Sequence, residues 1–368
     1  MRKVPVDLVK PGMYLARSII DSEGVVLLRA GVELDELYLN RLRSLGIRNI
    51  YVRDENFGDT DEVEDVISEE TRINTVRMVK KTFSQLQNQR KINTAALRQT
   101  VNNLLDEILD NANVLVSVST ISALDDYIFF HSVSVCTLSI LTGITLGYSE
   151  STLRELGIGA LLHDIGKAEI EPDILKREGA LNEEEAEILA THTTKGYQIL
   201  RGYSDIPLLS AHVAFQHHER WDGKGYPRQL AGTKITEFAR IVAVANFYDN
   251  LVADLPNRPS YEVNQAINLI KRLAGSYFDP KIASITTSHI ASYPVGTIVM
   301  LNTGDIGMVV RVSPDSPHRP QVRILFNKYL QRLEKQHEVD LSGLSTIFIQ
   351  HVLSEIELDR MLNSVVNR

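Results

Sequence analysis

The chain has one cysteine, no excess of basic residues and few histidines. The single thiol, Cys136, cannot form an intramolecular disulfide, so we expect a reducing, cytoplasmic setting. Lys and Arg total 39 against 47 Asp and Glu, and the net charge is −8. This balance argues against a nucleic-acid polymer as partner, because such proteins usually carry a basic surface. Any phosphate site must therefore be local, built from a few Lys, Arg or metal ions.

Long apolar runs are also lacking. The first residues, MRKVPVDLVKPGMYL, are partly basic but have no apolar core of the kind that a secretory signal needs. No run approaches the roughly 18–20 apolar residues of a membrane span, so we expect none. No period of about 20–50 residues repeats, which argues against a solenoid. The 368 residues, 43% of them apolar, suffice for two or three globular domains.

The patterning divides the chain into five segments. In the first, DSEG separates two apolar runs (13–21 and 25–31) and predicts a hairpin, while 34–47 reads as a helix ending at Gly46 and RNIYV as a strand. We predict a small β/α module at 1–60, a helical connector at 61–119, a helical domain at 120–292, a small β module at 293–352 and a helical tail at 353–368. The expected fold class is mainly α, with a helical bundle core and small β-rich modules at both ends.

Three helical stretches carry further signals. Asn93 or Thr94 is the expected cap of a helix whose apolar residues follow at helical spacing, and Asn182 with Glu185 resembles a capping box that opens a helix over 181–200. His192 is predicted to lie inside that second helix. The acidic stretch 53–66 is expected to be a solvated linker or helix start. The helix at 66–89 is a candidate for pairing with a copy of itself, which would make a homodimer.

Five histidines and one aspartate are concentrated in the helical region. They are His131, His163, Asp164, His192, His217 and His218, with successive spacings of 32, 29 and 25 residues along the chain. Such spacings correspond to a helix plus a loop, so each ligand would come from a different helix of a bundle. Singly, His131 reads better as a core histidine, His192 as a surface one, and the 163–164 pair as a core contact or ion pair. Together they favour iron, manganese or zinc, and two ions sharing one aspartate suit phosphodiester cleavage.

The string HHERWDGKGYP, residues 217–227, is the second unusual feature. Gly223 and Gly225 permit positive φ, and Pro227 cannot continue a helix. The loop is either an ordinary tight turn or a means of bringing Lys224 and Tyr226 over the metal pocket.

HDIGK together with HHERWDGKGYP resembles the HD-GYP family of HD phosphohydrolases, over roughly residues 120–290. HSVSV around His131, HTTKGYQIL and ARIVAVANFYDNL add to the resemblance. It implies a helical HD-type domain with two or three metal ions, usually iron or manganese, that hydrolyses cyclic di-GMP to pGpG or GMP. The residues it implies are metal ligands at His131, His163, Asp164, His192, His217, His218 and Asn246, with Asp164 bridging and catalytic; Lys167 as a catalytic and substrate phosphate contact; Tyr226 and Arg258 as substrate contacts; and Asp222, Gly223, Gly225 and Pro227 in the loop.

Three positions depart from the family pattern. Asn246 stands where the family has a metal-binding Asp, and an uncharged amide holds a divalent ion less tightly. Tyr261 replaces the second of two basic residues that contact phosphate, of which Arg258 is kept. Tyr127 replaces a Glu that holds a third metal in some members, so we expect two ions. Asp249, three residues after Asn246, is expected to be structural first and a substitute ligand second.

These features leave three functional hypotheses. The first is a metal-dependent cyclic di-GMP phosphodiesterase. The second is an inactive or weakly active cyclic di-GMP receptor, with GGDEF-type proteins as partners at the GYP loop, which the changes at Asn246 and Tyr261 would explain. The third is a helical scaffold with a folding metal, in which His217→Ala would lower the melting temperature without affecting ligand binding. Lys167, Arg258 and the GYP loop argue against the third, because a structural metal needs none of them.

Overall fold

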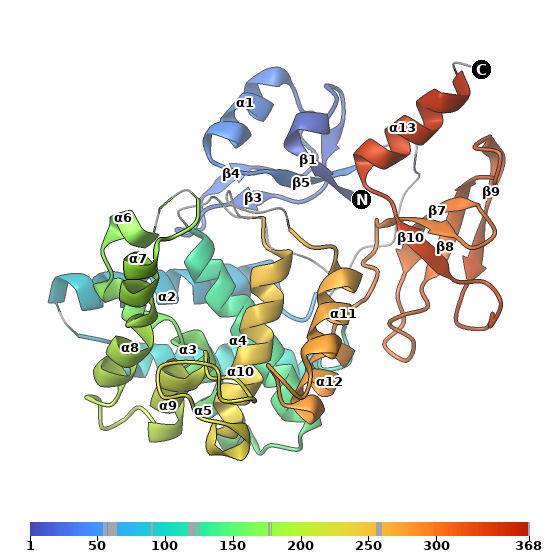
Figure 1. The fold of residues 1–368 in the computed structure, drawn as a ribbon. Coiled ribbons are helices and arrows are strands. Elements are labelled where there is room, and N and C mark those ends of the chain that lie inside the picture. The colour runs from blue at the N-terminus through green and yellow to red at the C-terminus, as the bar shows by residue number, and fades with distance from the viewer. Residues whose placement is uncertain are drawn as a thin grey trace.

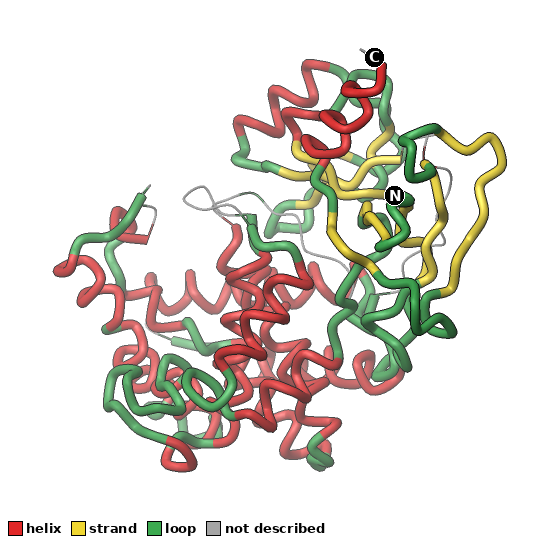
Figure 2. Tube along the Cα trace, turned by 45° about the vertical axis from the view of Figure 1, so that its right-hand side comes forward, coloured by secondary structure: helices red, strands yellow, loops and turns green. Residues whose placement is uncertain are grey.

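The computed structural model describes residues 1–53, 57, 65–89, 91–116, 123, 126–175, 177, 179–254 and 260–366. A helical domain forms the lower part of Figure 1, with the N-terminal module above it and the C-terminal β module to its right. Figure 2 shows the same division as red helices against yellow strands. The predicted fold class, mainly α with β-rich modules at both ends, is confirmed.

The N-terminal module contains two small sheets around its own apolar core. β1 (Arg2–Pro5), β5 (Asn49–Arg53) and β2 (Tyr14–Leu15) form one antiparallel sheet in the order β1-β5-β2, and β3 (Ile19–Ile20) pairs with β4 (Val26–Leu28). The predicted hairpin is therefore correct for β3 and β4, whereas β2 pairs with β5. α1 (Glu36–Ser44) starts at Asp35, whose carboxylate accepts the N–H of Tyr38.

The helical domain surrounds α4. The helices here are α2 (Glu69–Gln89), α3 (Thr94–Asp110), α4 (Tyr127–Thr145), α5 (Glu150–Leu161), η4 (Ile165–Glu169), α6 (Pro172–Leu175), α7 (Glu183–Ala190), α8 (His192–Leu200), α9 (Leu208–Gln216), η5 (Gly232–Lys234), α10 (Glu237–Val252), α11 (Val263–Leu273) and α12 (Pro280–Ser288). α4 packs against α2, α3, α5, α10 and α12. It is the central helix of the largest apolar core.

α4 also corrects the expectation that no run approaches the length of a membrane span. Among the described residues, its 19 residues alone have the length and hydropathy of a span, with a mean hydropathy of 1.6. Of that apolar window, 72% is buried inside the structure. The apolar character is explained by packing, since a helix surrounded by other helices is hydrophobic all round.

The helix expected over 181–200 is divided in two, which corrects the predicted position of His192. Asn182 and Glu185 form the capping box that the sequence predicts, but α7 ends at Ala190. His192 is the first residue of α8 and is buried, rather than lying within a continuous surface helix. His192 thus follows the break at Thr191, and its side chain is 1% exposed.

α2 and α3 pack within the chain. Asn93 caps α3 by accepting the N–H of Ala96, as predicted. The apolar residues of α2, including Val76, Val79 and Phe83, belong to the core of the helical domain. This face of α2 is therefore already covered by α3 and α4, and pairing with a second copy through it stays a prediction without support from packing.

The C-terminal module is a five-stranded antiparallel sheet with a helix. β6 (Ile298–Leu301), β7 (Ile306–Arg311), β8 (Gln321–Phe326), β9 (Arg332–Asp340) and β10 (Ile349–Val352) lie in the order β10-β6-β7-β8-β9. α13 (Glu355–Val366) packs Leu358 against Ile298 of this sheet. Arg2 of β1 pairs with Glu355, so the first strand contacts the start of α13.

Candidate metal centre

His163 and Asp164 lie in the tight turn between α5 and η4, and both are fully buried. The turn lies directly against the start of α8. A Cβ at Gly166 would lie 1.9 Å from the carbonyl oxygen of His192 and 2.6 Å from the amide nitrogen of Gly196. Only glycine permits this contact, which places the histidine–aspartate pair beside His192.

The two carboxylate oxygens of Asp164 face two different pairs of histidines. Oδ2 lies 3.4 Å from Nε2 of His163 and 4.0 Å from Nε2 of His131. Oδ1 lies 3.3 Å from Nε2 of His192 and 3.7 Å from Nε2 of His217. The four imidazoles thus direct the same nitrogen toward one carboxylate, with one pair at each oxygen.

Backbone carbonyls fix the orientation of three of these rings. Nδ1 of His163 lies 2.7 Å from the carbonyl of Ala160, and Nδ1 of His192 lies 2.7 Å from that of Leu189. Nδ1 of His217 lies 3.1 Å from the carbonyls of Val213 and Ala214. A carbonyl can only accept, so each Nδ1 carries a proton, and in the neutral ring Nε2 is then the nitrogen with the free lone pair. This tautomer is the one that a metal ligand requires.

His131 is oriented by a carboxylate instead. Its Nδ1 donates to Oδ2 of Asp249 at 2.6 Å. The hydroxyl of Tyr127, one turn earlier on α4, lies 3.3 Å from the same nitrogen and 3.4 Å from Oδ2 of Asp249. Asp249 is therefore a partner of a candidate ligand, in keeping with the expectation that it is structural first. A carboxylate that accepts from the far nitrogen of a ligating histidine raises the basicity of that ligand.

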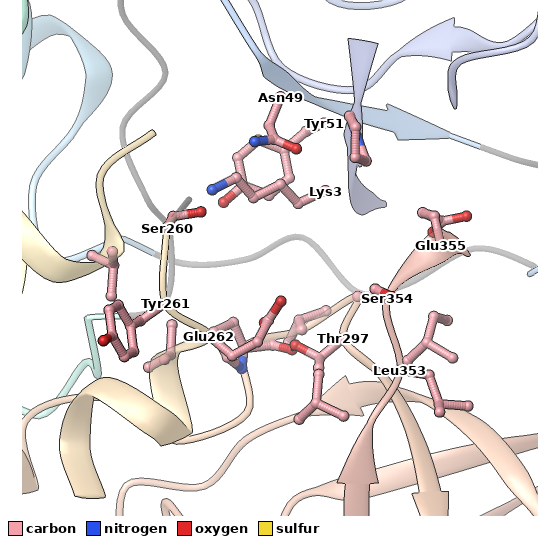
Figure 3. Close-up of a pocket in the computed structure, with 18 residues that line it drawn as sticks. Lys3, Asn49, Tyr51, Ser260, Tyr261, Glu262, Thr297, Leu353, Ser354 and Glu355 are labelled. Carbon is pink, nitrogen blue, oxygen red and sulfur yellow. The ribbon is translucent and has the colours of Figure 1, made fainter. Parts of the chain in front are cut away.

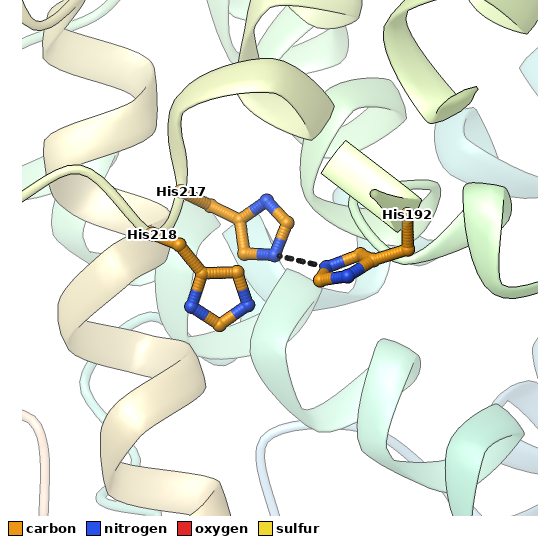
Figure 4. A group of neighbouring side chains, drawn as sticks. All are labelled: His192, His217 and His218. Atoms are coloured by element: carbon orange, nitrogen blue, oxygen red, sulfur yellow. Dashed lines mark hydrogen bonds between the residues drawn. The ribbon is translucent and has the colours of Figure 1, made fainter. Parts of the chain in front are cut away.

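His192, His217 and His218 converge from two chain segments, as Figure 4 shows. Nε2 of His192 lies 3.3 Å from Nε2 of His217, and the rings of His217 and His218 have centroids 4.2 Å apart. Two groups have ligand atoms within 4.8 Å of one another: His192 with His217 and His218, and His131 with His163 and Asp164. This grouping suits two ions.

The GYP loop covers the group formed by His192, His217 and His218. The ring of Tyr226 stacks on His218 with centroids 4.7 Å apart and remains 37% exposed. Gly225 has no room for a side chain, because a Cβ there would lie 2.4 Å from the carbonyl oxygen of His218. Gly223 has φ +76°, and Asp222 accepts the N–H of Lys224. The peptide bond before Pro227 is cis.

Glu219 anchors this loop, and the sequence reasoning missed it. Its side chain is buried, and its carboxylate accepts the N–H groups of Arg228 at 2.7 Å and Leu230 at 2.9 Å. An acidic residue directly after the two histidines was the available signal. Gly166 and the contact of Asp249 with His131 were also missed, because each of these two roles depends on a neighbour far away in the sequence.

Burial and local charge set the protonation states of the centre. Burial alone would raise the pKa of Asp164, but Lys167 and His163 outweigh it and hold the pKa of that carboxyl well below its usual range. Burial lowers the pKa of His192 to about 4, against the attraction of Asp164, and lowers the pKa values of His217 and His218 strongly. The aspartate is thus ionised and these imidazoles are neutral, which are the ligating forms.

Lys167 is directed at the centre. Its Nζ donates to Oδ2 of Asp164 at 2.6 Å, and its side chain is 24% exposed. A positive charge therefore lies at the edge of the histidine cluster while part of the side chain still reaches solvent. This position fits the predicted phosphate contact.

The structure says less about three further positions from the sequence analysis: Asn246, Arg258 and Tyr261. Asn246 is buried on α10, and its Oδ1 accepts a hydrogen bond from Nδ2 of Asn250 at 2.7 Å. Arg258 lies outside the described residues. Tyr261 lines a cavity of about 170 Å³ where the N-terminal module, the helical domain and the C-terminal module meet, with Lys3 and Glu355 on other walls (Figure 3).

The buried donors and acceptors fit metal ions. Within the described residues, Nε2 of His163 and Oδ1 of Asp164 are buried and make no hydrogen bond. Such orphaned groups are costly unless an ion satisfies them. Imidazole and carboxylate ligands suit iron, manganese or zinc. Neither His212, which packs on Tyr197, nor His289, which lies 2.9 Å from Oγ1 of Thr145, belongs to either group.

The fold and the site together define a helical domain with a histidine–aspartate centre suited to metal ions. Residues 79–282, more than half of the chain, match the family model "HD domain", so the chain belongs to the HD domain family. Residues 298–360 match "KOW domain associated with HD domain". The resemblance on which the sequence analysis relied is thereby confirmed.

Similar proteins have been described in several bacteria. The chain is 32% identical over 250 residues to a cyclic di-GMP phosphodiesterase of Pseudomonas aeruginosa. The aligned region covers 68% of this chain and 60% of that protein. It is 40% identical over 153 residues to a cyclic di-GMP phosphodiesterase of Thermotoga maritima, over 41% of this chain and 42% of that protein. It is 32% identical over 144 residues to a 3'3'-cGAMP-specific phosphodiesterase of Vibrio cholerae, over 39% and 28%. The matches thus cover less than two thirds of each relative.

Proposed function

We propose that this protein is a metal-dependent phosphodiesterase that hydrolyses cyclic di-GMP to linear pGpG, and on to GMP if a second bond is cleaved. The observation that carries the proposal is the position of Asp164, whose two oxygens face two separate histidine pairs. Similarity to enzymes that are named for cyclic di-GMP supports the substrate class. Similarity to an enzyme named for 3'3'-cGAMP makes that dinucleotide the alternative substrate.

The six predicted protein ligands other than Asn246 would hold two divalent cations, iron or manganese. Such ions supply an activated water and stabilise both the attacking and the leaving oxygen of a phosphodiester. Asp164 would contribute one oxygen to each ion, and its low pKa keeps it ionised for that purpose. Histidine imidazoles complete each set.

The remaining residues of the site would bind the nucleotide. The ammonium of Lys167 would leave Asp164 in part to contact the phosphate, whose negative charge increases as the water attacks. Tyr226, held parallel to His218 by the GYP loop, presents an exposed aromatic face over the centre. A guanine base offers a surface for stacking on such a ring. Arg258 is the further predicted phosphate contact.

A cyclic di-GMP receptor of little or no activity is the second candidate, and Asn246 favours it. Its amide oxygen is engaged by Asn250 and carries no charge, so it would contribute weakly to an ion. In this proposal the GYP loop would offer its exposed surface to a GGDEF-type partner. A cytoplasmic setting, consistent with one buried free thiol, belongs to both proposals.

The test is a chromatographic assay on anaerobically purified protein. The protein is reconstituted separately with ferrous iron and with manganese, then incubated with cyclic di-GMP or with 3'3'-cGAMP. The phosphodiesterase proposal expects pGpG or GMP to accumulate from cyclic di-GMP, faster than product from cGAMP. The double variant His163→Ala with Asp164→Ala should form no product, whereas His289→Ala, a histidine outside the centre, should match the wild-type protein.

Intact cyclic di-GMP after long incubation with both metals loaded contradicts the enzyme. Nucleotide binding then separates the two remaining cases. Binding at micromolar concentration that Lys167→Met weakens supports the receptor. Binding that no substitution around the centre affects, or no binding at all, contradicts both proposals.

A further inference from the structure

Ser22 lies at the tip of the turn between β3 and β4 and is completely buried, although both strands belong to the small N-terminal module. The turn is tightly built. Oδ1 of Asp21 accepts the N–H groups of Glu23 at 2.9 Å and Val25 at 2.8 Å. Gly24 has φ +73°, and a Cβ there would lie 2.3 Å from the guanidinium of Arg77. This turn therefore docks closely on α2 of the helical domain.

The buried serine binds the residue that precedes α4. The backbone N–H of Ser22 donates to Oδ2 of Asp126 at 2.9 Å, and its hydroxyl donates to Oδ1 of the same carboxylate. Lys80 of α2 donates to the hydroxyl oxygen of Ser22 at 2.7 Å and pairs with Glu23 at 2.7 Å. It also lies 3.8 Å from Asp126. Three parts of the chain thus meet at one carboxylate.

Asp126 occupies the N-cap position of α4, but it does not cap the helix. Its backbone is in the αR region (φ −97°, ψ −9°), not in the extended conformation of a capping residue, and within the described residues its side chain makes no hydrogen bond to the first turn of α4. Both carboxylate oxygens are bound to Ser22 instead. The N-terminal module, rather than a cap, therefore holds the residue that precedes α4.

The first turn of α4 leads directly to the metal centre. Tyr127 follows Asp126, and its hydroxyl contacts His131 at 3.3 Å and Asp249 at 3.4 Å. His131, four residues after Tyr127, directs Nε2 toward Asp164. The N-terminal hairpin is thus connected to His131, a candidate ligand, through the carboxylate of Asp126 and about one turn of α4.

We propose that Ser22, Asp126 and Lys80 are positioning residues of the metal centre, through which the N-terminal module fixes the start of α4 and with it His131. The proposal rests on the metal centre of the proposed function and goes beyond it, because it gives the N-terminal module a role in metal binding. When the hairpin is displaced, Asp126 loses the two hydrogen bonds that hold the start of α4 in place. The first turn and His131 then shift relative to Asp164, and the centre binds metal less tightly.

The test compares Ser22→Ala with Ser18→Ala. Ser18 lies in the same module, and among the described residues its side chain accepts only the N–H of Ala30, so its substitution controls for the change in the module itself. Two quantities are measured: hydrogen exchange of the amides in 127–135 of metal-free protein, and the dissociation constant for manganese. Ser22→Ala should exchange at least tenfold faster over 127–135 and bind manganese about tenfold more weakly. Ser18→Ala should leave both unchanged.

Asp126→Asn provides the second variant, should Ser22→Ala fold poorly, because it keeps the size of the side chain but removes the charge and one of the two acceptor oxygens that Ser22 uses. The double variant Ser22→Ala with Asp126→Asn should bind manganese no more weakly than the weaker-binding single variant, since both residues act through one contact. Additive losses, or unchanged affinity with unchanged exchange over 127–135, overturn the proposal. Wild-type protein that takes up no manganese or iron refutes the metal centre itself, a different outcome from normal uptake by Ser22→Ala.

Discussion

Nδ1 of His131 donates to Oδ2 of Asp249 at 2.6 Å, so a residue three positions beyond Asn246 determines how a candidate ligand is presented. The chain thus lacks a carboxylate at Asn246 and has one that acts on a neighbouring histidine. Through this hydrogen bond Asp249 raises the basicity of His131, a candidate ligand.

Asp249→Asn should weaken metal binding by about 10- to 100-fold, the usual effect of losing the partner of a ligating histidine. The asparagine can still accept from Nδ1, but it no longer carries the charge that raises the basicity of His131. Isothermal titration of metal-free protein with manganese measures the change. The control is Asp254→Asn, which affects an ion pair with Lys3 just beyond the end of α10. It should bind manganese as the wild-type protein does. Equal affinities for both variants would show that the contact only supports packing.

Asn246→Asp should strengthen metal binding by at least about tenfold, because a carboxylate is a better ligand for a divalent ion than an amide. Turnover of cyclic di-GMP should rise with it if the amide limits the wild-type chemistry. Asn103→Asp adds the same charge on the exposed face of α3 and serves as the matched control. A metal affinity that does not increase would mean that residue 246 does not reach an ion. A large gain in turnover from an inactive wild-type protein would favour the receptor.

Gly166→Ala should destabilise the protein by at least about 2 kcal/mol and weaken metal binding at the same time. The added methyl group would overlap the backbone of His192, so the turn that carries His163 and Asp164 must move away from α8. Chemical denaturation and a manganese titration measure the two effects. Gly343→Ala, where a Cβ meets nothing within 4 Å, should change neither. A stable Gly166→Ala variant with normal metal affinity would show that α8 can shift without affecting the centre.

Metal removal should lower stability by mass action. At a free metal concentration 100 times the dissociation constant, bound metal contributes about 2.7 kcal/mol, which a chelator removes. The melting temperature of the wild-type protein should therefore fall on chelation, and that of His289→Ala should fall equally. His163→Ala, which removes a candidate ligand from one of the two groups, should show a smaller fall on chelation than the wild-type protein. A fall of wild-type size in His163→Ala would place the stabilising ion elsewhere.

The sequence by itself determined the composition of the centre and the class of fold. Histidines separated by helix-plus-loop lengths, an adjacent aspartate and the HHERWDGKGYP string are local patterns, readable without coordinates. The caps at Asn93 and Asn182 were also predictable, because a cap depends on residues within one turn. The apolar length of α4 was underestimated from the sequence. What the sequence could not show is that other helices surround α4, because burial is not a local property.

Tertiary structure alone decided how these residues work together. The position of one histidine pair at each oxygen of Asp164, and the hydrogen bonds of His131 to Asp249 and of Ser22 to Asp126, join segments far apart in sequence. No periodicity or propensity carries such information, because each contact depends on how whole helices pack. The amino-acid sequence thus supplied the ligands, and the packing of α4, α5, α8, α9 and α10 supplied their geometry.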